Sequence, residues 1–374
     1  MQNVTLGVKD IIDVAGLPTK AGSQGMGNHP AAEDAECVRL LRAAGLKIVG
    51  KTTTTAYASF DPSPALNPWN IQHTPGGSSS GSAVAVSLGQ VQVALGTQTG
   101  GSVIRPAAYC GVYGFKPTWG AISLKGVLPL APSLDHLGWM AKRIQDLQLL
   151  WKILAGQGTS NRHLPLSLLN LGGYFSKNLD HQIKSMMQHC CDLLSVDQLE
   201  ETPSSWNDID EVHLNIMAIE ASQVHAYRFH DQPEDYPPNI TRLIRHGQKF
   251  SQREYQQLLD SQKKLRDEAI DLWRNRILIT PAIPSPAPES STTGDPRFNT
   301  PWSLLGWPTV CMPVRLSDGG LPMAIQLSSP PGTDQQLLET AAGLERDFPW
   351  DLHPPVSNWG LSAEQFGAFV NQPN

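Results

Sequence analysis

Residues 75–106 read PGGSSSGSAVAVSLGQVQVALGTQTGGSVIRP, and this stretch decides the interpretation of the whole chain. Two segments rich in glycine and small polar residues, 75–82 and 96–106, flank the apolar segment 83–95. Glycines permit backbone dihedrals that other residues avoid, so such segments can direct several backbone N–H groups at one point. An anion or a developing oxyanion is the natural occupant of that point. Ser102, at the end of the second turn, would then lie beside the donors.

A serine nucleophile needs a base, and the sequence offers a lysine in place of a histidine. The eleven histidines are scattered and do not follow the pattern of a Ser-His-Asp triad. A lysine can serve as a base when desolvation lowers its pKa. Lys9 follows the apolar run Leu6-Gly7-Val8, so we expect it on a short buried strand. Its pKa must fall from about 10.4 to about 7–8, a cost of roughly 4 kcal/mol.

Residues 45–52, GLKIVGKT, match the Walker A pattern but lack its context. Phosphate binding by that motif requires a strand before the loop and a helix after it. Here the apolar spacing of 34–44 predicts a helix before the motif, and 46–49 read as a buried strand. We therefore do not expect ATP binding.

Residues 77–81, GSSSG, match the nucleophile elbow of α/β-hydrolases, which requires a strand leading into the serine. The preceding residues, 70–76, form a loop that contains a proline. We therefore do not expect Ser79 to be an elbow nucleophile.

Composition and charge exclude several classes of protein. The 374 residues carry a formal net charge of −6, which argues against a general nucleic-acid binder. No run approaches 18 consecutive apolar residues, and the first ten residues resemble no secretory signal. The five cysteines are an odd number without framework spacing, so we expect reduced thiols and a cytoplasmic location. No HExxH or CxxC pair suggests a metal, and we expect no cofactor.

We expect a single domain over 1–374, in three zones. Residues 1–155 hold the Gly/Ser motifs, 156–276 form a variable helical part, and 277–374 complete the core. Periodicity predicts further elements, which are strands at 90–95 and 277–280 and helices at about 251–274 and 335–346.

Three motifs in order resemble the amidase signature family. They are Gly7-Val8-Lys9-Asp10, the PGGSSSGS segment at 75–82 and the GTQTGGS segment at 96–102. Further likeness lies at 111–118, 133–138 and 294–296, and covers most of the chain. The resemblance implies an α/β fold, with a large mixed, twisted sheet covered by helices on both faces. Because family members usually have helices before the lysine strand, those helices are expected to be missing or short here.

The resemblance also implies the chemistry, which is hydrolysis of a small carboxamide C–N bond. Carried over position by position, it makes Ser102 the acylated nucleophile and Lys9 the ultimate base. Ser78, in a cis peptide, would relay protons between them. The oxyanion hole would be formed by the backbone N–H groups of Thr99, Gly100, Gly101 and Ser102. Asp135 and His136 lie in a family-like turn, where we expect a structural role.

The sequence departs from the family pattern near Ser102. Many members carry Asp where Gln98 stands, and place arginine two residues after the serine, where this chain has Ile104. The Gln98/Arg105 variant resembles the malonamidase branch, in which the arginine helps to hold a substrate carboxylate. We expect Arg105 to bind such a carboxylate, and a structural ion pair is the alternative. Ser79 is a second candidate for substrate contact.

Three functions remain open at this point. The leading one is an amide hydrolase, and the alternatives are a glutaminase-type subunit of an amidotransferase and a non-catalytic amidase-like binding domain. The presence of Ser102 and Lys9 disfavours the last. The partners that we expect are a small-molecule amide and a second copy of the chain in a homodimer, with neither nucleic acid nor membrane.

Overall fold

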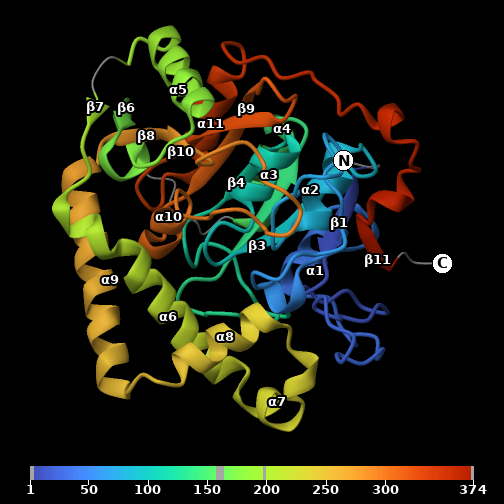
Figure 1. The fold of residues 1–374 in the computed structure, drawn as a ribbon. Helices are drawn as coiled ribbons and strands as arrows, with labels where there is room; N and C mark the ends of the chain where they lie inside the picture. Colours follow the sequence, from blue (N-terminus) through green and yellow to red (C-terminus); the bar gives the residue numbers. More distant parts are fainter. Residues whose placement is uncertain (1–3, 157–163, 197–198, 372–374) are drawn as a thin grey trace.

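The computed structural model describes residues 4–156, 164–196 and 199–371, and its centre is one large sheet (Figure 1). The strand order is β11-β2-β1-β3-β5-β4-β9-β10-β8-β6-β7. The strands are β1 (Thr5–Lys9), β2 (Lys47–Thr52), β3 (Val93–Gln98), β4 (Tyr113–Lys116), β5 (His136–Ala141), β6 (Ser167–Leu171), β7 (Leu199–Glu200), β8 (Arg276–Pro281), β9 (Thr309–Leu316), β10 (Pro322–Ser328) and β11 (Phe369–Asn371).

The sheet is mixed. Strand β1 runs parallel to both of its neighbours, β2 and β3, and β6 runs parallel to β7 and β8. The pairs from β3 through β5, β4, β9 and β10 to β8 are antiparallel, as is the pair of β11 with β2. The expected mixed α/β sheet flanked by helices is therefore confirmed.

Helices flank this sheet, and four of them gather beside it (Figure 1). The α-helices are α1 (Glu36–Ala43), α2 (Ser80–Ser87), α3 (Ile104–Cys110), α4 (Ile144–Leu154), α5 (His181–Leu193), α6 (Ile209–Val224), α7 (Ala226–Asp231), α8 (Pro238–Gly247), α9 (Gln252–Trp273), α10 (Thr300–Leu305) and α11 (Asp334–Leu344). Helices α6, α7, α8 and α9 form the group at the lower left of Figure 1. Helix α9 begins with a capping box between Ser251 and Glu254, close to its predicted start.

The predicted strand at 90–95 is displaced in the structure. The residues before Val93 belong to the turn that follows α2, in which the Gln90 and Val91 amides bond the Ala85 carbonyl. The strand runs instead over Val93–Gln98, and all six side chains are buried. A strand with helices on both faces has no solvent side, so its polar/apolar alternation is absent. The alternation of QVQVAL was therefore misleading.

The predicted strand at 46–49 is β2, which continues to Thr52 and confirms that the Walker-like segment is not a phosphate loop. Lys51, the lysine of that pattern, is fully buried and forms an ion pair with Asp10, with 3.0 Å between Nζ and Oδ1. Both side chains are thus committed to the packing around β1 and β2.

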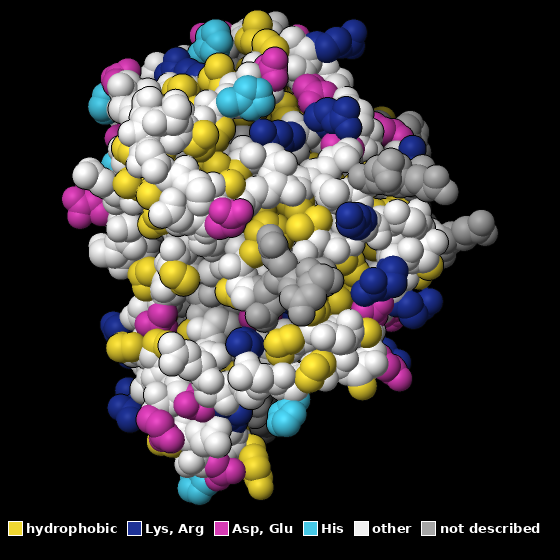
Figure 2. Space-filling model, turned by 90° about the vertical axis from the view of Figure 1, so that its right-hand side faces the viewer, with side chains coloured by type: hydrophobic (Ala, Val, Ile, Leu, Met, Phe, Trp, Pro, Cys, Tyr) yellow, Lys and Arg dark blue, Asp and Glu magenta, His cyan; other side chains and the backbone are white. Residues whose placement is uncertain are grey.

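The surface carries charges of both signs. On the face drawn in Figure 2, acidic and basic side chains are interspersed among uncharged ones, and hydrophobic side chains form several small groups. No helix among the described residues combines the length and the apolar character that a membrane crossing requires.

Candidate active site

Lys9 is the last residue of β1, at the point where the sheet brings three distant segments together. Its side chain is fully buried. Its ammonium nitrogen Nζ lies 2.7 Å from Ser78 Oγ and 2.8 Å from Thr97 Oγ1. Strand β1 pairs directly with β3, which ends beside Thr97, and this pairing explains the second contact. The lysine therefore has two hydroxyl groups as partners.

Burial changes the proton affinity of Lys9. Desolvation lowers its pKa from 10.5 to about 7, and the nearby charge of Asp135 acts in the opposite direction. A lysine with a pKa near 7 is neutral for a substantial fraction of the time at physiological pH, so its nitrogen can accept a proton.

Ser78 lies in a tightly held turn. The Gly77–Ser78 peptide bond is cis. The carbonyl of Ser78 accepts hydrogen bonds from the Thr54 hydroxyl at 3.1 Å and from the Thr55 amide at 3.2 Å. Gly76 has φ +81°, and a Cβ there would lie 2.8 Å from Cα of Pro106, so only glycine fits.

Ser102 lies against this turn from the other side. Its carbonyl accepts a hydrogen bond from the amide of Ser79 at 3.3 Å, which ties it to the residue that follows Ser78. The residue is 9% exposed, at the edge of the buried site. Within the described part of the chain, the Ser102 hydroxyl makes no hydrogen bond. The structure thus joins Lys9 and Ser78 by a hydrogen bond and brings Ser102 beside them without one.

The segment Thr99–Gly100–Gly101–Ser102 presents free backbone donors. Its first three carbonyls accept hydrogen bonds, from the His213 ring at 2.9 Å, the Ser303 hydroxyl at 2.6 Å and the Arg105 amide at 3.0 Å. No acceptor for its four N–H groups exists among the described residues. The four N–H groups are thus available to a ligand, and their role as an oxyanion hole stays a prediction.

Gln98, which replaces the usual Asp, anchors the start of α3. Its side-chain oxygen accepts hydrogen bonds from the amides of Val103 at 2.8 Å and Ile104 at 3.0 Å, and its nitrogen donates to Ser303. The side chain therefore occupies the role of a helix N-terminal cap.

Arg105 is 1% exposed and only partly paired. Its Nη2 donates to the Gly77 carbonyl at 2.8 Å and to the Thr293 hydroxyl at 3.3 Å. Its Nε and Nη1 are buried and have no partner among the described residues, and no ion pair forms there either. Burial lowers its pKa to about 10, so the guanidinium stays charged near neutrality.

Ser79, the other candidate for substrate contact, is fully buried. Its hydroxyl donates to the Thr97 carbonyl and accepts from the Thr97 amide, both at 3.3 Å. These bonds attach the turn to the end of β3, and contact with substrate stays a prediction.

Sequence reasoning missed four residues that surround this site. Thr97 could have been found, since it lies two residues before Thr99 in the same motif. His213 and Ser303 come from the variable and C-terminal zones, where no motif pointed to the site, whereas Thr293 directly precedes the family-like segment 294–296.

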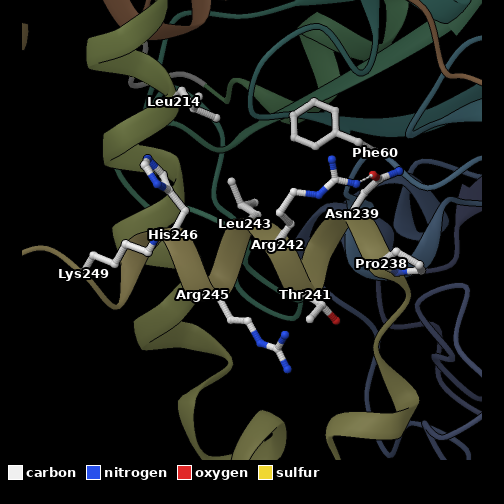
Figure 3. Close-up of a pocket in the computed structure, with 10 residues that line it drawn as sticks. All are labelled: Phe60, Leu214, Pro238, Asn239, Thr241, Arg242, Leu243, Arg245, His246 and Lys249. Carbon is white, nitrogen blue, oxygen red and sulfur yellow. Dashed lines mark hydrogen bonds between the residues drawn. The ribbon is translucent and has the colours of Figure 1, made fainter.

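Two of the hollows of the molecule differ in their relation to this site. The larger, of about 700 Å³, is lined by Phe60 and by residues of α6 and α8, and it includes none of the three proposed catalytic residues (Figure 3). A smaller cavity of about 230 Å³ is lined by Thr97, Thr99 and Asp135. Among the described residues, no group of three metal-capable side chains occurs.

Comparison with known proteins agrees with this geometry. The family model described as Amidase matches residues 1–338. The chain belongs to the amidase family. This amidase is 29% identical to a glutamyl-tRNA(Gln) amidotransferase subunit of Symbiobacterium thermophilum, in a match that covers 91% of this chain and 82% of the relative.

Solved structures extend the likeness to the fold of the amidase. A structure described as that of an amidase superimposes with a TM-score of 0.84 and 30% identity, covering 92% of this chain and 84% of the other. The peptide amidase of Stenotrophomonas maltophilia has a TM-score of 0.75 and 24% identity, covering 94% and 84%, and shows the shared fold. The expected family and an amide-hydrolysing enzyme are thereby confirmed.

Proposed function

We propose that this amidase hydrolyses a small carboxamide through an acyl-enzyme on Ser102. The observation that carries the proposal is the 2.7 Å hydrogen bond between Lys9 Nζ and Ser78 Oγ, beside four unpaired backbone N–H groups that end at Ser102. A neutral lysine accepts a proton from Ser78 as Ser78 takes one from Ser102, so the Ser102 hydroxyl gains nucleophilicity.

The reaction then has two halves. Ser102 Oγ attacks the amide carbon, and the resulting oxyanion is bound by the N–H groups of 99–102. The C–N bond breaks as the leaving nitrogen receives the proton held by Lys9, delivered through Ser78. Water attacks the ester by the same relay, releases the acid and restores Ser102. By precedent, one oxyanion donor contributes about 3–4 kcal/mol to the barrier reduction.

Covalent labelling tests this mechanism without knowledge of the substrate. A sulfonyl fluoride should modify the folded protein on Ser102, located by mass spectrometry of peptides. Ser102→Ala should remove the adduct, and Lys9→Met should slow labelling by about 10²-fold or more. Ser123→Ala, at an exposed serine, is the matched control and should label normally. An unlabelled Ser102 in folded protein would contradict the proposal.

Arg105 supports a substrate with a carboxylate close to the amide. A buried guanidinium with Nε and Nη1 unpaired is costly to bury, and a bidentate carboxylate would satisfy both donors. The alternative role, a structural ion pair, is disfavoured because no described carboxylate lies within ion-pair distance of Arg105, and Asp295 acts on it only from farther away. We therefore infer that an acidic amide is the preferred substrate class.

Paired substrates test this inference. Arg105→Ala should lower kcat/KM for a dicarboxylic acid monoamide by about 10²–10³-fold, because the carboxylate loses a buried charged partner. A neutral amide of the same length should lose less than about tenfold, through the lost contact with the Gly77 carbonyl. Equal losses on both substrates would refute the carboxylate contact.

A second candidate function follows from the relatives. Two of them carry the name of one subunit of glutamyl-tRNA(Gln) amidotransferase, so each is by name one part of an assembly. If this chain works likewise, it would release ammonia from glutamine for a partner protein. Turnover of glutamine only after addition of a partner protein would favour this function, whereas turnover of a small amide by the isolated chain would favour simple hydrolysis.

A further inference from the structure

Asp135 is a buried carboxylate that contacts Thr99, the first residue of the proposed oxyanion segment, 99–102. It directly precedes β5 and is 7% exposed. Its Oδ1 accepts a hydrogen bond from the Thr99 hydroxyl at 2.6 Å. Its Oδ2 accepts from the amides of Leu130 at 2.8 Å and Ala131 at 3.0 Å. Three donors thus fix the carboxylate in one orientation, with Thr99 as its link to the active site.

Asp135 lines the same small cavity as Thr97, the hydrogen-bond partner of Lys9. Thr97, which accepts the hydrogen bond from Lys9 Nζ, lies two residues before Thr99, and both threonines line the 230 Å³ cavity together with Asp135. Each of the two threonines thus contacts one member of the pair, Thr97 the base and Thr99 the carboxylate. Ser78 occupies the other side of Lys9 Nζ.

Two other acidic groups lie near Lys9 and Asp135, and each is bound to a different partner. Asp10, next to Lys9 on β1, pairs with Lys51 of β2. Glu220 of α6 accepts hydrogen bonds from the Ser133 amide at 2.9 Å and the Tyr255 hydroxyl at 2.6 Å.

Two histidines also approach the pair from neighbouring elements. His213 of α6 bonds the Thr99 carbonyl, and burial lowers its pKa to about 4, so it is neutral near pH 7. His136 bonds the Leu134 carbonyl, and burial also lowers its pKa. Asp135 is accordingly the carboxylate whose charge acts on Lys9.

We propose that Asp135 is a positioning residue for the reaction, with two effects. Its negative charge stabilises the ammonium form of Lys9 after proton uptake, and its hydrogen bond to Thr99 holds the first N–H group of the oxyanion segment in place. This inference rests on the proposed function, since it assigns a role in the same proton relay. It extends the structural role expected for this turn.

A negative charge near Lys9 is useful because Lys9 must hold the proton taken from Ser102 until the leaving nitrogen accepts it. A lysine desolvated without any counter-charge becomes a weak base and returns its proton too early. Burial raises the pKa of Asp135 to about 6, so the carboxylate is ionised above that pH, where Lys9 titrates. A neighbouring negative charge therefore keeps the base strong enough to store the proton for the leaving group.

The test is the pH dependence of Ser102 labelling in Asp135→Asn. Asparagine retains the shape and its oxygen can accept from Leu130 and Ala131, while its nitrogen would donate to the Thr99 hydroxyl, so the charge is removed and the direction of the Thr99 bond is reversed. Labelling requires neutral Lys9, so the rate rises with pH through a midpoint near 7 in the wild type. Loss of the charge should move this midpoint down by about one pH unit.

Two further variants separate charge from position. Asp135→Glu keeps the charge and should hold the midpoint near the wild-type value even if its rate falls. Thr99→Val keeps Asp135 but removes the bond between them, and should lower the rate about tenfold or more at an unchanged midpoint. If the Asp135 variants do not fold, Thr99→Val still decides the positioning role.

These experiments distinguish a failure of the proposed mechanism from a failure of the role proposed for Asp135. Wild-type protein that does not label on Ser102 would remove the mechanism itself. Wild-type labelling with an Asp135→Asn midpoint equal to the wild type would overturn the role of the charge. A Thr99→Val rate equal to the wild type would overturn the role in positioning.

Discussion

At the scale of one residue, the burial of Lys9 that makes its amine reactive also lowers the stability of the folded protein. Its Nζ is fully buried and bonds two hydroxyl groups, with no carboxylate in hydrogen-bond contact among the described residues. In the unfolded chain the same lysine is hydrated and protonated at neutral pH. Folding must therefore remove a proton or bury a charge, and either costs free energy.

We expect Lys9→Met to raise the free energy of unfolding at pH 7 by about 1–3 kcal/mol while slowing the labelling of Ser102 by about 10²-fold or more. The folded pKa is about 7 and the unfolded value 10.5, so between these values the unfolded state binds more protons and wild-type stability rises with pH. The advantage of the variant should shrink toward pH 10.5. Urea unfolding of the wild type and the variant at pH 7 and pH 10 measures this difference in the free energy of unfolding. A variant that is less stable than the wild type at both pH values would contradict the cost assigned to burying Lys9.

At the scale of elements, the segment 99–102 is held between α6 and α10. His213 of α6 and Ser303 of α10 bond its carbonyls, and Asn299, at the start of α10, lies against Gly101. Asn299 is itself fixed by donation to the Ala282 carbonyl and to Gln326. The helices thus determine where the segment's N–H groups point.

Gly101→Ala tests this confinement. A Cβ at position 101 would lie 2.5 Å from Asn299 Oδ1, a contact that forces the segment or the helix to move. We expect the labelling rate to fall about 10²-fold and the free energy of unfolding to fall by about 1–3 kcal/mol. Gly343→Ala, inside α11 with nothing within 4 Å, is the control and should label as the wild type. Normal labelling of Gly101→Ala would show that the segment has room to adjust.

Sequence reasoning succeeded for these elements where local pattern decides the structure. The apolar spacing of 34–44 predicted α1, and the apolar periodicity of about 251–274 predicted α9. The motif spacing also selected Lys9 and Ser78, which the structure places in hydrogen-bond contact. It failed for β3, because a strand buried on both faces shows no alternation. It also missed His213, which reaches Thr99 from 114 residues away through tertiary packing alone.

At the scale of the whole molecule, one sheet unites segments from all three zones of the sequence. The N-terminal strand β1 lies between β2 and β3, and strands from the last third, β8, β9 and β10, extend the same sheet. The family resemblance predicted this mixed sheet, whereas the strand order is a property of packing between distant segments. Such long-range pairing makes folding slow compared with helical bundles of local contacts.

The short strand β11 gives this topology a consequence for biosynthesis. Residues 369–371 pair with β2, and just before them the Ala368 and Gly367 carbonyls accept bonds from Thr53. Before residues 369–371 are synthesised, this edge of β2 has no partner strand. An open backbone edge of this kind recruits other chains. The edge of β2 is therefore covered only after residues 369–371 emerge from the exit tunnel.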